Sequence, residues 1–288
     1  MLKLLSRKMN LISVDCVLLN YNSGSLTVNL AEHLAKSPSV NSVIIVDNKS
    51  SNNSLKELNK VKNSKIVIIQ NKDNLGFAAG INVGIRRALK KQTGQILIVN
   101  PDININNSDL SKLYLSQAQI ISPVLKFKKK DTWLYDLGGK VNWILGRTYH
   151  KETSVMPSVS SHNNSIDFVS GACMKVSKNV FRKIGLFDER YFMYFEDVDF
   201  CLRAKREEFN IDVNLNVIVQ HNLEIHKISK NLSKIKNSLI SNYKFIKKWL
   251  PAILKPTAYL YIFFLVMKYL YLLLTTSYST HSYFPERA

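Results

Sequence analysis

Short apolar runs alternate with helix-length segments along the first third of the chain. Four of these runs are rich in β-branched residues, as buried strands are: residues 14–19, 43–46, 66–69 and 96–99. Between them, the segments that begin at Gly24 and Gly76 repeat apolar residues at helical spacing. Strands that alternate with helices in this way form right-handed βαβ units. The pattern therefore predicts an α/β fold with a mainly parallel sheet.

The pattern loosens after about residue 125. Residues 126–130 read as a basic loop, residues 137–139 as a turn and residues 158–165 as a polar linker. An apolar strand then covers residues 211–219 and ends at Gln220 and His221. We expect a first domain over residues 1–225, with one half at about 12–125 and a second at about 126–225.

Residues 226–288 predict a separate C-terminal segment. From Ile228 to Lys248 apolar residues recur at helical spacing with lysines on the other faces, and an apolar tail follows from Pro256 to Leu274. Lys268 near the middle of that tail would cost roughly 3 kcal/mol at the centre of a bilayer. We therefore favour a helix that lies in the membrane interface or re-enters it, over a true span or a core helix.

The formal net charge of +19 predicts an anionic partner, which composition alone leaves open between nucleic acid, a phosphorylated ligand and an anionic membrane surface. Aromatic residues that bind nucleic acid interleave with Lys and Arg, whereas here they cluster in residues 191–195 and in the tail. No nucleic-acid partner is therefore expected. The three cysteines are widely spaced among apolar residues and residues 1–8 lack a signal-peptide core, which favours buried thiols in a reducing cytosol.

The segment from Tyr191 to Asp199 places three carboxylates directly after an aromatic and apolar run. Carboxylates in such surroundings lose water, and their proton affinity rises toward the range of a general base. If Glu196 opens a helix, Glu196 and Asp199 share one face, and Asp197 projects about 100° away. The alternative is an acidic first turn that complements the helix dipole, with Asp199 paired to Arg203.

Polar residues also follow two of the predicted strands. Asp47 to Ser50 come after residues 43–46, and Asn100, Pro101 and Asp102 come after residues 96–99. Strands that end this way place side chains at the carboxyl edge of the sheet, where open α/β folds bind ligands. Turn formation explains either group separately, and it explains both together less well.

Taken in order, these motifs resemble the signature series of the GT-A family 2 glycosyltransferases, in particular their bacterial rhamnosyltransferase-like branch. The series runs from about residue 12 to residue 225 and comprises Leu19 to Asn22, Val46 to Ser50, Asn74 to Asn82, Asn100 to Asp102, Gly171 to Cys173, Phe187 to Glu189, Tyr194 to Asp199, and His221.

The resemblance implies roles for these positions. Donor-site residues would be Asn20, Asp47, Asn74, Gly76, Asn82 and Asn100, with Asp47 at the base or ribose. Asp102 would be the main acidic ligand of a divalent metal, and His221 a further ligand. Asp197 would be the catalytic base, with Glu196 beside it. Glu196 and Asp199 would hold the acceptor or orient Asp197, and Tyr194 and Gly171 would also lie at the acceptor. No glycine-rich phosphate loop is present, so Mg²⁺ or Mn²⁺ would neutralise the donor diphosphate.

The expected function is therefore inverting transfer of a sugar, rhamnose being one candidate, from a nucleotide diphosphate sugar. The acceptor would be a saccharide or a lipid-linked saccharide in cell-surface polysaccharide assembly. The expected location is the cytoplasmic face of the cell membrane, as a peripheral or monotopic protein. The alternative is a basic, non-catalytic module that binds membrane or nucleic acid, and such a module would not require Asp102, Asp197 or His221.

Overall fold

The computed structural model describes residues 13–129, 131–157, 165–222 and 232–279. The predicted domain boundary at residue 225, the start of the basic helix at Ile228, residues 1–8 and nearly all of the predicted linker at 158–165 lie outside these ranges.

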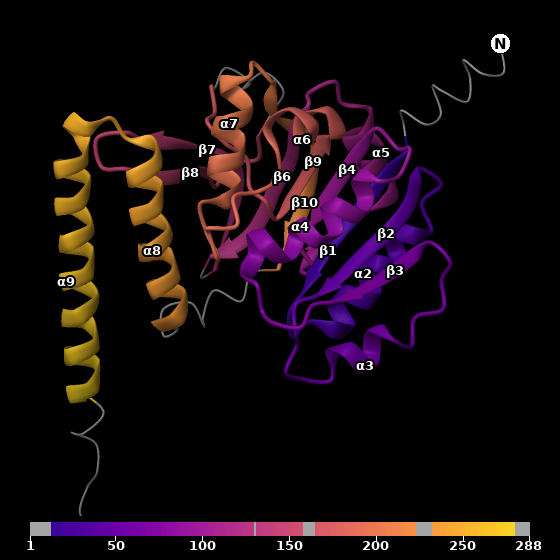
Figure 1. Cartoon of the computed structure of the whole chain (residues 1–288), viewed down its shortest axis with the longest axis horizontal. Helices are drawn as coiled ribbons and strands as arrows, with labels where there is room; N and C mark the ends of the chain where they lie inside the picture. Colours follow the sequence, from indigo (N-terminus) through magenta and orange to yellow (C-terminus); the bar gives the residue numbers. More distant parts are fainter. Residues whose placement is uncertain (1–12, 130, 158–164, 223–231, 280–288) are drawn as a thin grey trace, which may run out of the picture.

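One mixed sheet of ten strands forms the centre of the described chain (Figure 1). Its first four strands are parallel, in the order β3 (Ile66–Gln70), β2 (Val40–Asp47), β1 (Val14–Asn20) and β4 (Gln95–Val99). The order continues with β9 (Cys173–Ser177), β6 (Ile120–Lys129), β10 (Ile211–His221) and β5 (Ile103–Asn104). β9 runs antiparallel to β4 and β6, whereas β10 is parallel to β6. The α/β prediction with a parallel first half is confirmed.

Successive side chains along each strand point to opposite faces of the sheet, so the strands contribute to two hydrophobic cores, one on each face. In β1, Val17 packs into one core while Cys16 and Leu18 pack into the other. The helices of one core are α4 (Gly76–Leu89), α6 (Lys178–Ile184) and α7 (Glu196–Arg206); those of the other are α2 (Gly24–Ala35), α3 (Ser54–Leu58) and α5 (Asn107–Leu115). All three cysteines are buried free thiols, as the sequence predicts.

A hairpin of β7 (Thr132–Asn142) and β8 (Arg147–Thr153) extends from the sheet, and the sequence patterns did not predict it. The expected basic loop at 126–130 is wrong: β6 continues to Lys129, and the Lys126 ammonium lies 4.5 Å from the ring centroid of Trp133. The expected turn at 137–139 is a bulge inside β7, where Gly138 has φ +82° and the register shifts. Pairing of β7 with its neighbours β6 and β8 forms these elements, so the composition of each segment taken alone is misleading here.

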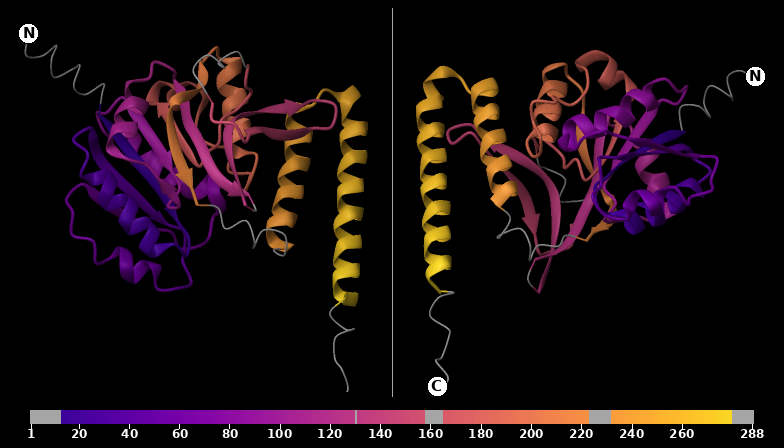
Figure 2. Two further views of the ribbon diagram at one scale, coloured as in Figure 1. Left: turned by 180° about the vertical axis from the view of Figure 1, so that it is seen from behind. Right: turned by 60° about the horizontal axis from the view of Figure 1, so that its bottom comes forward.

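The C-terminal part consists of α8 (Leu232–Trp249), a short 3₁₀ turn η3 (Ala252–Leu254) and α9 (Lys255–Ser279), with α8 and α9 side by side (Figure 2). α8 buries Phe245, Ile246 and Trp249 in the same core as α4 and α7. α9 differs, because only 6% of the apolar window Ala252–Tyr271 is buried. By length and composition this helix could cross a membrane, and the core-helix alternative is wrong.

Candidate active site

The donor edge begins with Asn20 and Asp47, which are register partners at the carboxyl ends of β1 and β2. Asp47 is fully buried, and its Oδ1 accepts hydrogen bonds from Asn20 Nδ2 at 2.6 Å and from Ser50 Oγ at 2.6 Å. The Asn20 side-chain oxygen in turn accepts from Thr27 Oγ1 at 2.7 Å. These bonds fix the loop that follows β2. The expected contact of Asp47 with the base or ribose of a donor stays a prediction.

Asn48, a motif residue for which the sequence predicted no role of its own, organises the next part of this edge. Its Nδ2 donates to Asn74 Oδ1 at 2.9 Å, and its Oδ1 accepts from the backbone N–H of Leu75 at 3.2 Å. Asn74 Oδ1 also accepts from the N–H of Gly76 at 3.0 Å, so Asn74 shapes the entrance to α4.

Gly76 permits close contact between α4 and the loop that carries the acidic segment. It has φ +77°, and a Cβ atom there would lie 2.2 Å from the carbonyl oxygen of Phe192. The next residue, Phe77, donates its N–H to that same oxygen at 2.6 Å. A side chain at position 76 would therefore push the two segments apart.

Asn82 does not face the donor edge. It is fully buried in α4, donates to the carbonyl of Phe187 at 2.9 Å and to Glu189 Oε1 at 3.0 Å, and accepts from the N–H of Phe187 at 3.1 Å. Its amide is thus used within the protein, because it ties α4 to residues 187–189. The expectation that Asn82 shapes the nucleotide-sugar site is corrected to a role in positioning that segment.

The structure brings the two expected metal ligands together. β10 pairs with β5 so that His221 lies opposite Ile103, and His221 Nε2 is 3.3 Å from Asp102 Oδ2. Asp102 Oδ1 is buried and has no hydrogen-bond partner. Among the described residues no group of three His, Cys, Asp or Glu side chains could hold a metal. The pair with its unpartnered oxygen fits a divalent ion whose other ligands come from substrate and water.

The carboxylate pair Glu196 and Asp197 opens α7 from an unusual backbone. Tyr194 and Phe195 both have left-handed φ angles, of 72° and 70°, a conformation that side-chain-bearing residues seldom adopt and that concentrates at functional sites. The side chain of Tyr194 is 38% exposed, so it remains accessible to a ligand. α7 thus presents both carboxyls at its N-terminus, where the helix dipole favours negative charge.

Burial raises the pKa of both carboxyls. The pKa of Glu196 lies well above its usual range because of desolvation and the charge of Asp197, and Glu196 Oε2 has no hydrogen-bond partner. Desolvation also raises the pKa of Asp197, opposed by the N–H groups of Gly171, 3.0 Å away, and Val198, 2.8 Å away, and by the charge of His150. Such a carboxylate is suited to accept a proton.

Gly171 joins this pair to the metal motif. Its N–H holds Asp197, while the carbonyl of the next residue, Ala172, accepts from the N–H of Asn100 at 2.8 Å. Asn100 therefore acts through its backbone in this structure. Because two adjacent residues anchor both segments, Asp197 and the Asn100-to-Asp102 turn belong to one site.

Asp199 is not available to an acceptor. It is fully buried, and its oxygens contact Arg203 Nε at 2.9 Å, Lys248 Nζ at 2.6 Å and Trp249 Nε1 at 2.7 Å. The acceptor role is thereby corrected, and the Asp199–Arg203 pair proposed as the alternative is confirmed. The contacts from α8, together with the bond from Ser241 Oγ to the carbonyl of Met193 at 2.9 Å, clamp the acidic segment onto the C-terminal helices.

Sequence reasoning missed a second charged pair, Asp136 of β7 and His150 of β8. Their Oδ2 and Nδ1 atoms are 2.8 Å apart. Burial lowers the pKa of His150, but the hydrogen bond and charge of Asp136 outweigh this, and with Asp197 and Glu152 they raise it to about 9. The only sequence signal was Gly138 and Gly139 within an otherwise strand-like stretch, which is typical of a bulge.

A parallel half-sheet with polar residues at its carboxyl edge, joined to a carboxylate pair of buried Glu196 and partly buried Asp197, defines an α/β enzyme of the GT-A type. The model of the family described as "Glycosyl transferase family 2" matches residues 15–183. The chain therefore belongs to glycosyl transferase family 2, whose members transfer a sugar from a nucleotide sugar.

Three relatives illustrate the similarity. The chain is 31% identical over 209 residues to the low-salt glycan biosynthesis hexosyltransferase Agl10 of Haloferax volcanii, covering 69% of this chain and 63% of that protein. It is 23% identical over 214 residues to the dTDP-rhamnosyl transferase RfbF of Shigella flexneri, covering 69% of each. It is 27% identical over 176 residues to the rhamnosyltransferase WbbL of Escherichia coli, covering 48% of this chain and 65% of that protein. The alignments thus span about two thirds of these relatives' lengths.

Two solved structures share the fold. GalNAc-T7 with UDP, GalNAc and Mn²⁺ matches with a TM-score of 0.64 at 13% identity, covering 83% of this chain and 48% of that one. The mannosyltransferase PcManGT of Pyrobaculum calidifontis, with GDP-Man and Mn²⁺, matches with a TM-score of 0.58 at 12% identity, covering 85% of this chain and 68% of that one. These similarities confirm the GT-A fold.

Proposed function

We propose that the protein is an inverting glycosyltransferase that moves a hexose, rhamnose being one candidate, from a nucleotide diphosphate sugar to a saccharide or lipid-linked acceptor. The observation that carries this proposal is Asp197: a desolvated carboxylate at a helix N-terminus, oriented by two backbone N–H groups and joined through residues 171 and 172 to the Asp102 turn.

In the proposed reaction Asp197 accepts the proton of the acceptor hydroxyl. The hydroxyl oxygen bonds to the anomeric carbon as the bond from that carbon to the diphosphate breaks. Attack from the face opposite the leaving group inverts the anomeric centre. The left-handed turn at Tyr194 and Phe195 aims α7 so that Asp197 stands at the site, and Tyr194 is exposed beside it to contact the acceptor.

Asp102 and His221 would hold a divalent metal on the donor side. Mg²⁺ or Mn²⁺ bound there would neutralise negative charge on the diphosphate, and the histidine tilts the preference toward Mn²⁺. The solved structures of GalNAc-T7 and PcManGT were both determined with Mn²⁺, which supports the proposal.

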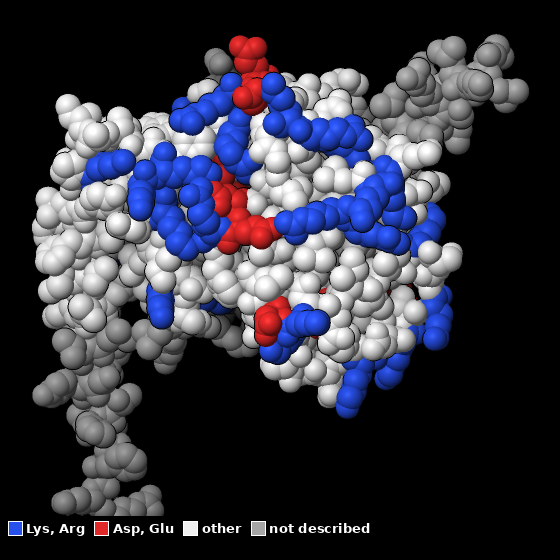
Figure 3. All heavy atoms as spheres, in the orientation of Figure 1, with Lys and Arg blue, Asp and Glu red and all other residues white. Residues whose placement is uncertain are grey.

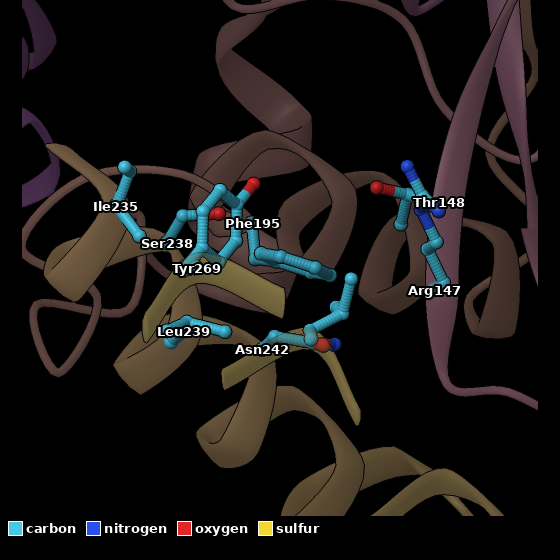
Figure 4. A pocket seen from close by; sticks show the side chains of 9 residues that line it. Arg147, Thr148, Phe195, Ile235, Ser238, Leu239, Asn242 and Tyr269 are labelled. Atoms are coloured by element: carbon cyan, nitrogen blue, oxygen red, sulfur yellow. The ribbon is translucent and has the colours of Figure 1, made fainter. Parts of the chain in front are cut away.

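A cavity of about 220 Å³ supports an acceptor that approaches from a membrane. Figure 4 shows the Phe195 ring between side chains of α8 and those of β8, and Leu265 and Tyr269 of α9 complete the lining. Phe195 directly precedes the carboxylate pair, so the cavity connects the catalytic segment with the exposed apolar helix. We place the lipid-proximal part of the acceptor here.

The basic surface and α9 support attachment to an anionic membrane on its cytoplasmic side. Figure 3 shows Lys and Arg side chains spread over one face around a short group of acidic ones. Each such cation near an anionic leaflet contributes about 1 kcal/mol, and the apolar face of α9 adds a salt-insensitive contribution.

Thermal stabilisation by a panel of nucleotide sugars, followed by a transfer assay with the best donor, tests this function. We expect one nucleotide sugar to raise the melting temperature in the presence of Mn²⁺ or Mg²⁺, and excess chelator to abolish turnover. Asp102→Ala should weaken donor binding as well as rate, because the variant lacks a ligand for the metal ion that would neutralise the two phosphate charges of the donor. Full activity in excess chelator would remove the metal from this mechanism.

A further inference from the structure

Backbone pairing connects the hairpin of β7 and β8 to the segment that carries Gly171. His150 of β8 lies opposite Gly139 of β7, and Gly139 donates its N–H to the carbonyl of Phe168 at 2.9 Å. Phe168 leads within three residues to Gly171, whose N–H holds Asp197. The His150 ring contacts Phe168 edge-on, with centroids 5.1 Å apart. These contacts place the His150 ring against the segment that leads to Gly171, which holds Asp197.

We propose that His150, held by Asp136, is a positioning residue that keeps the single negative charge of the carboxylate pair on Asp197 rather than on Glu196. The inference rests on the proposed function, in which Asp197 is the base, and it adds a residue that neither the family motifs nor the sequence indicated.

The two carboxyls cannot both ionise freely, because adjacent charges in a desolvated site repel each other and titrate as a coupled pair. Their surroundings differ. Glu196 Oε2 has no partner, whereas Asp197 accepts two backbone N–H groups, and the charge of His150 favours its ionised form. The proton is therefore held by Glu196, and Asp197 is free to act as base.

Asp136 is what keeps His150 charged and oriented. Its side chain is 9% exposed, with Oδ2 at His150 and Oδ1 accepting from the N–H of Gly138 at 2.9 Å. Gly138 provides that bond from a left-handed backbone inside the β7 bulge. The charged groups that face His150 are Asp136 from β7, Asp197 from α7 and Glu152 from β8 itself. All three are carboxylates, so the surroundings favour the cation.

The pH dependence of kcat/KM tests this role. We expect His150→Asn to move the acid limb of the profile to higher pH, because Asp197 loses a neighbouring cation and binds its proton more tightly. Asp136→Asn should move it in the same direction, and His150→Lys should keep it near the wild-type position. Affinity for UDP, or for whichever nucleoside diphosphate stabilises the wild-type protein, should stay within a few-fold.

Glu152→Gln is the matched control. It removes a carboxylate near His150 that also contacts Lys129, at 3.2 Å, and it should leave the acid limb in place because Asp136 still holds the imidazole. A lower plateau in His150→Asn with an unmoved acid limb would reduce His150 to a structural residue and overturn the proposal. Should His150→Asn fail to fold, Asp136→Asn and His150→Lys decide the same question.

A titration of the His150 imidazole by NMR, in wild type and in Asp197→Asn, needs no turnover. We expect the His150 pKa to fall when Asp197 loses its charge. An unchanged pKa would overturn the electrostatic pairing whatever the activity. A protein that shows the coupling but transfers no sugar from any nucleotide donor would instead contradict the proposed function, and the pairing would stand.

Discussion

Asp199 separates two explanations of the acidic segment, contact with the acceptor and structural anchoring. The substitution Asp199→Asn removes the charge at near-constant volume. In the wild type this carboxylate meets Arg203 from its own helix and Lys248 and Trp249 from α8, and it is fully buried. We expect the substitution to lower stability without changing acceptor affinity in the protein that remains folded.

The size of the loss follows from these contacts. Breaking a buried ion pair by removing one partner costs about 3–5 kcal/mol, because the remaining charge is left uncompensated. Here Arg203 and Lys248 are 19% and 26% exposed, so water relieves part of that penalty. The asparagine oxygen can still accept from Trp249. The lower end of this range therefore applies, and we expect the free energy of unfolding to fall by about 3 kcal/mol, which lowers Tm by roughly 6–12 °C.

Thermal unfolding followed by tryptophan fluorescence measures this loss of stability. Acceptor saturation curves test whether acceptor affinity stays unchanged. Glu207→Gln is the control at the other end of α7: its partner Lys183 is 62% exposed and Glu207 itself 44%, so stability should change by less than about 0.5 kcal/mol. A normal Tm for Asp199→Asn together with a large rise in acceptor KM would refute the anchoring role.

Three further outcomes follow from the structure. Gly76→Ala should prevent stable folding, because its Cβ would lie 2.2 Å from the Phe192 carbonyl. Gly185→Ala meets nothing within 4 Å and should cost only the backbone strain of φ +78° and ψ −170°, about 1–3 kcal/mol; equal losses of stability in urea unfolding would contradict the clash at Gly76. His150 has its pKa raised from 6.5 to about 9, so its stabilising contribution is complete below pH 6.5 and is lost as pH rises through 9. The difference in stability between wild type and His150→Asn should therefore shrink from pH 6.5 to pH 9. A difference that stays constant over this window would contradict the stabilising role of the His150 charge. Truncation after Trp249 should give a more soluble protein with its donor site intact, and high salt alone should not release the full-length chain from membranes; a full-length chain that stays soluble at low salt without detergent would remove the membrane role of α9.

The parts of the fold that local patterns dictate were predictable from sequence. The four β-branched runs became β1 to β4, because each is rich in residues that favour strands and is separated from the next by a helix-length segment. Their polar ends met at one edge, and the distant residues Asp102 and His221 came within 3.3 Å of each other. The buried cysteines and the exposed apolar helix also followed from composition and length.

The rest depended on contacts between elements, which the composition of a single segment does not show. β7 and β8 were missed because cross-strand pairing, and not local propensity, holds their lysines and glycines in strands. Asp136 and His150 were missed with them. Asp199 was assigned to the acceptor because nothing in the sequence shows that Trp249, fifty positions later, donates to it. Asp47 and Asn82 resemble ligand-contacting residues in sequence, yet their hydrogen bonds close within the protein.

The most direct test of the central claim compares Asp197→Asn with Glu196→Gln in a single transfer assay with metal and the preferred nucleotide sugar. Asp197→Asn should lower kcat by about 10²–10⁴-fold, the scale of a lost general base, and leave donor affinity within a few-fold. Glu196→Gln keeps a neutral group where the wild type holds a proton, and should retain much of the activity. Near-normal turnover by Asp197→Asn, together with an inactive Glu196→Gln, would contradict the assignment and move the base to Glu196.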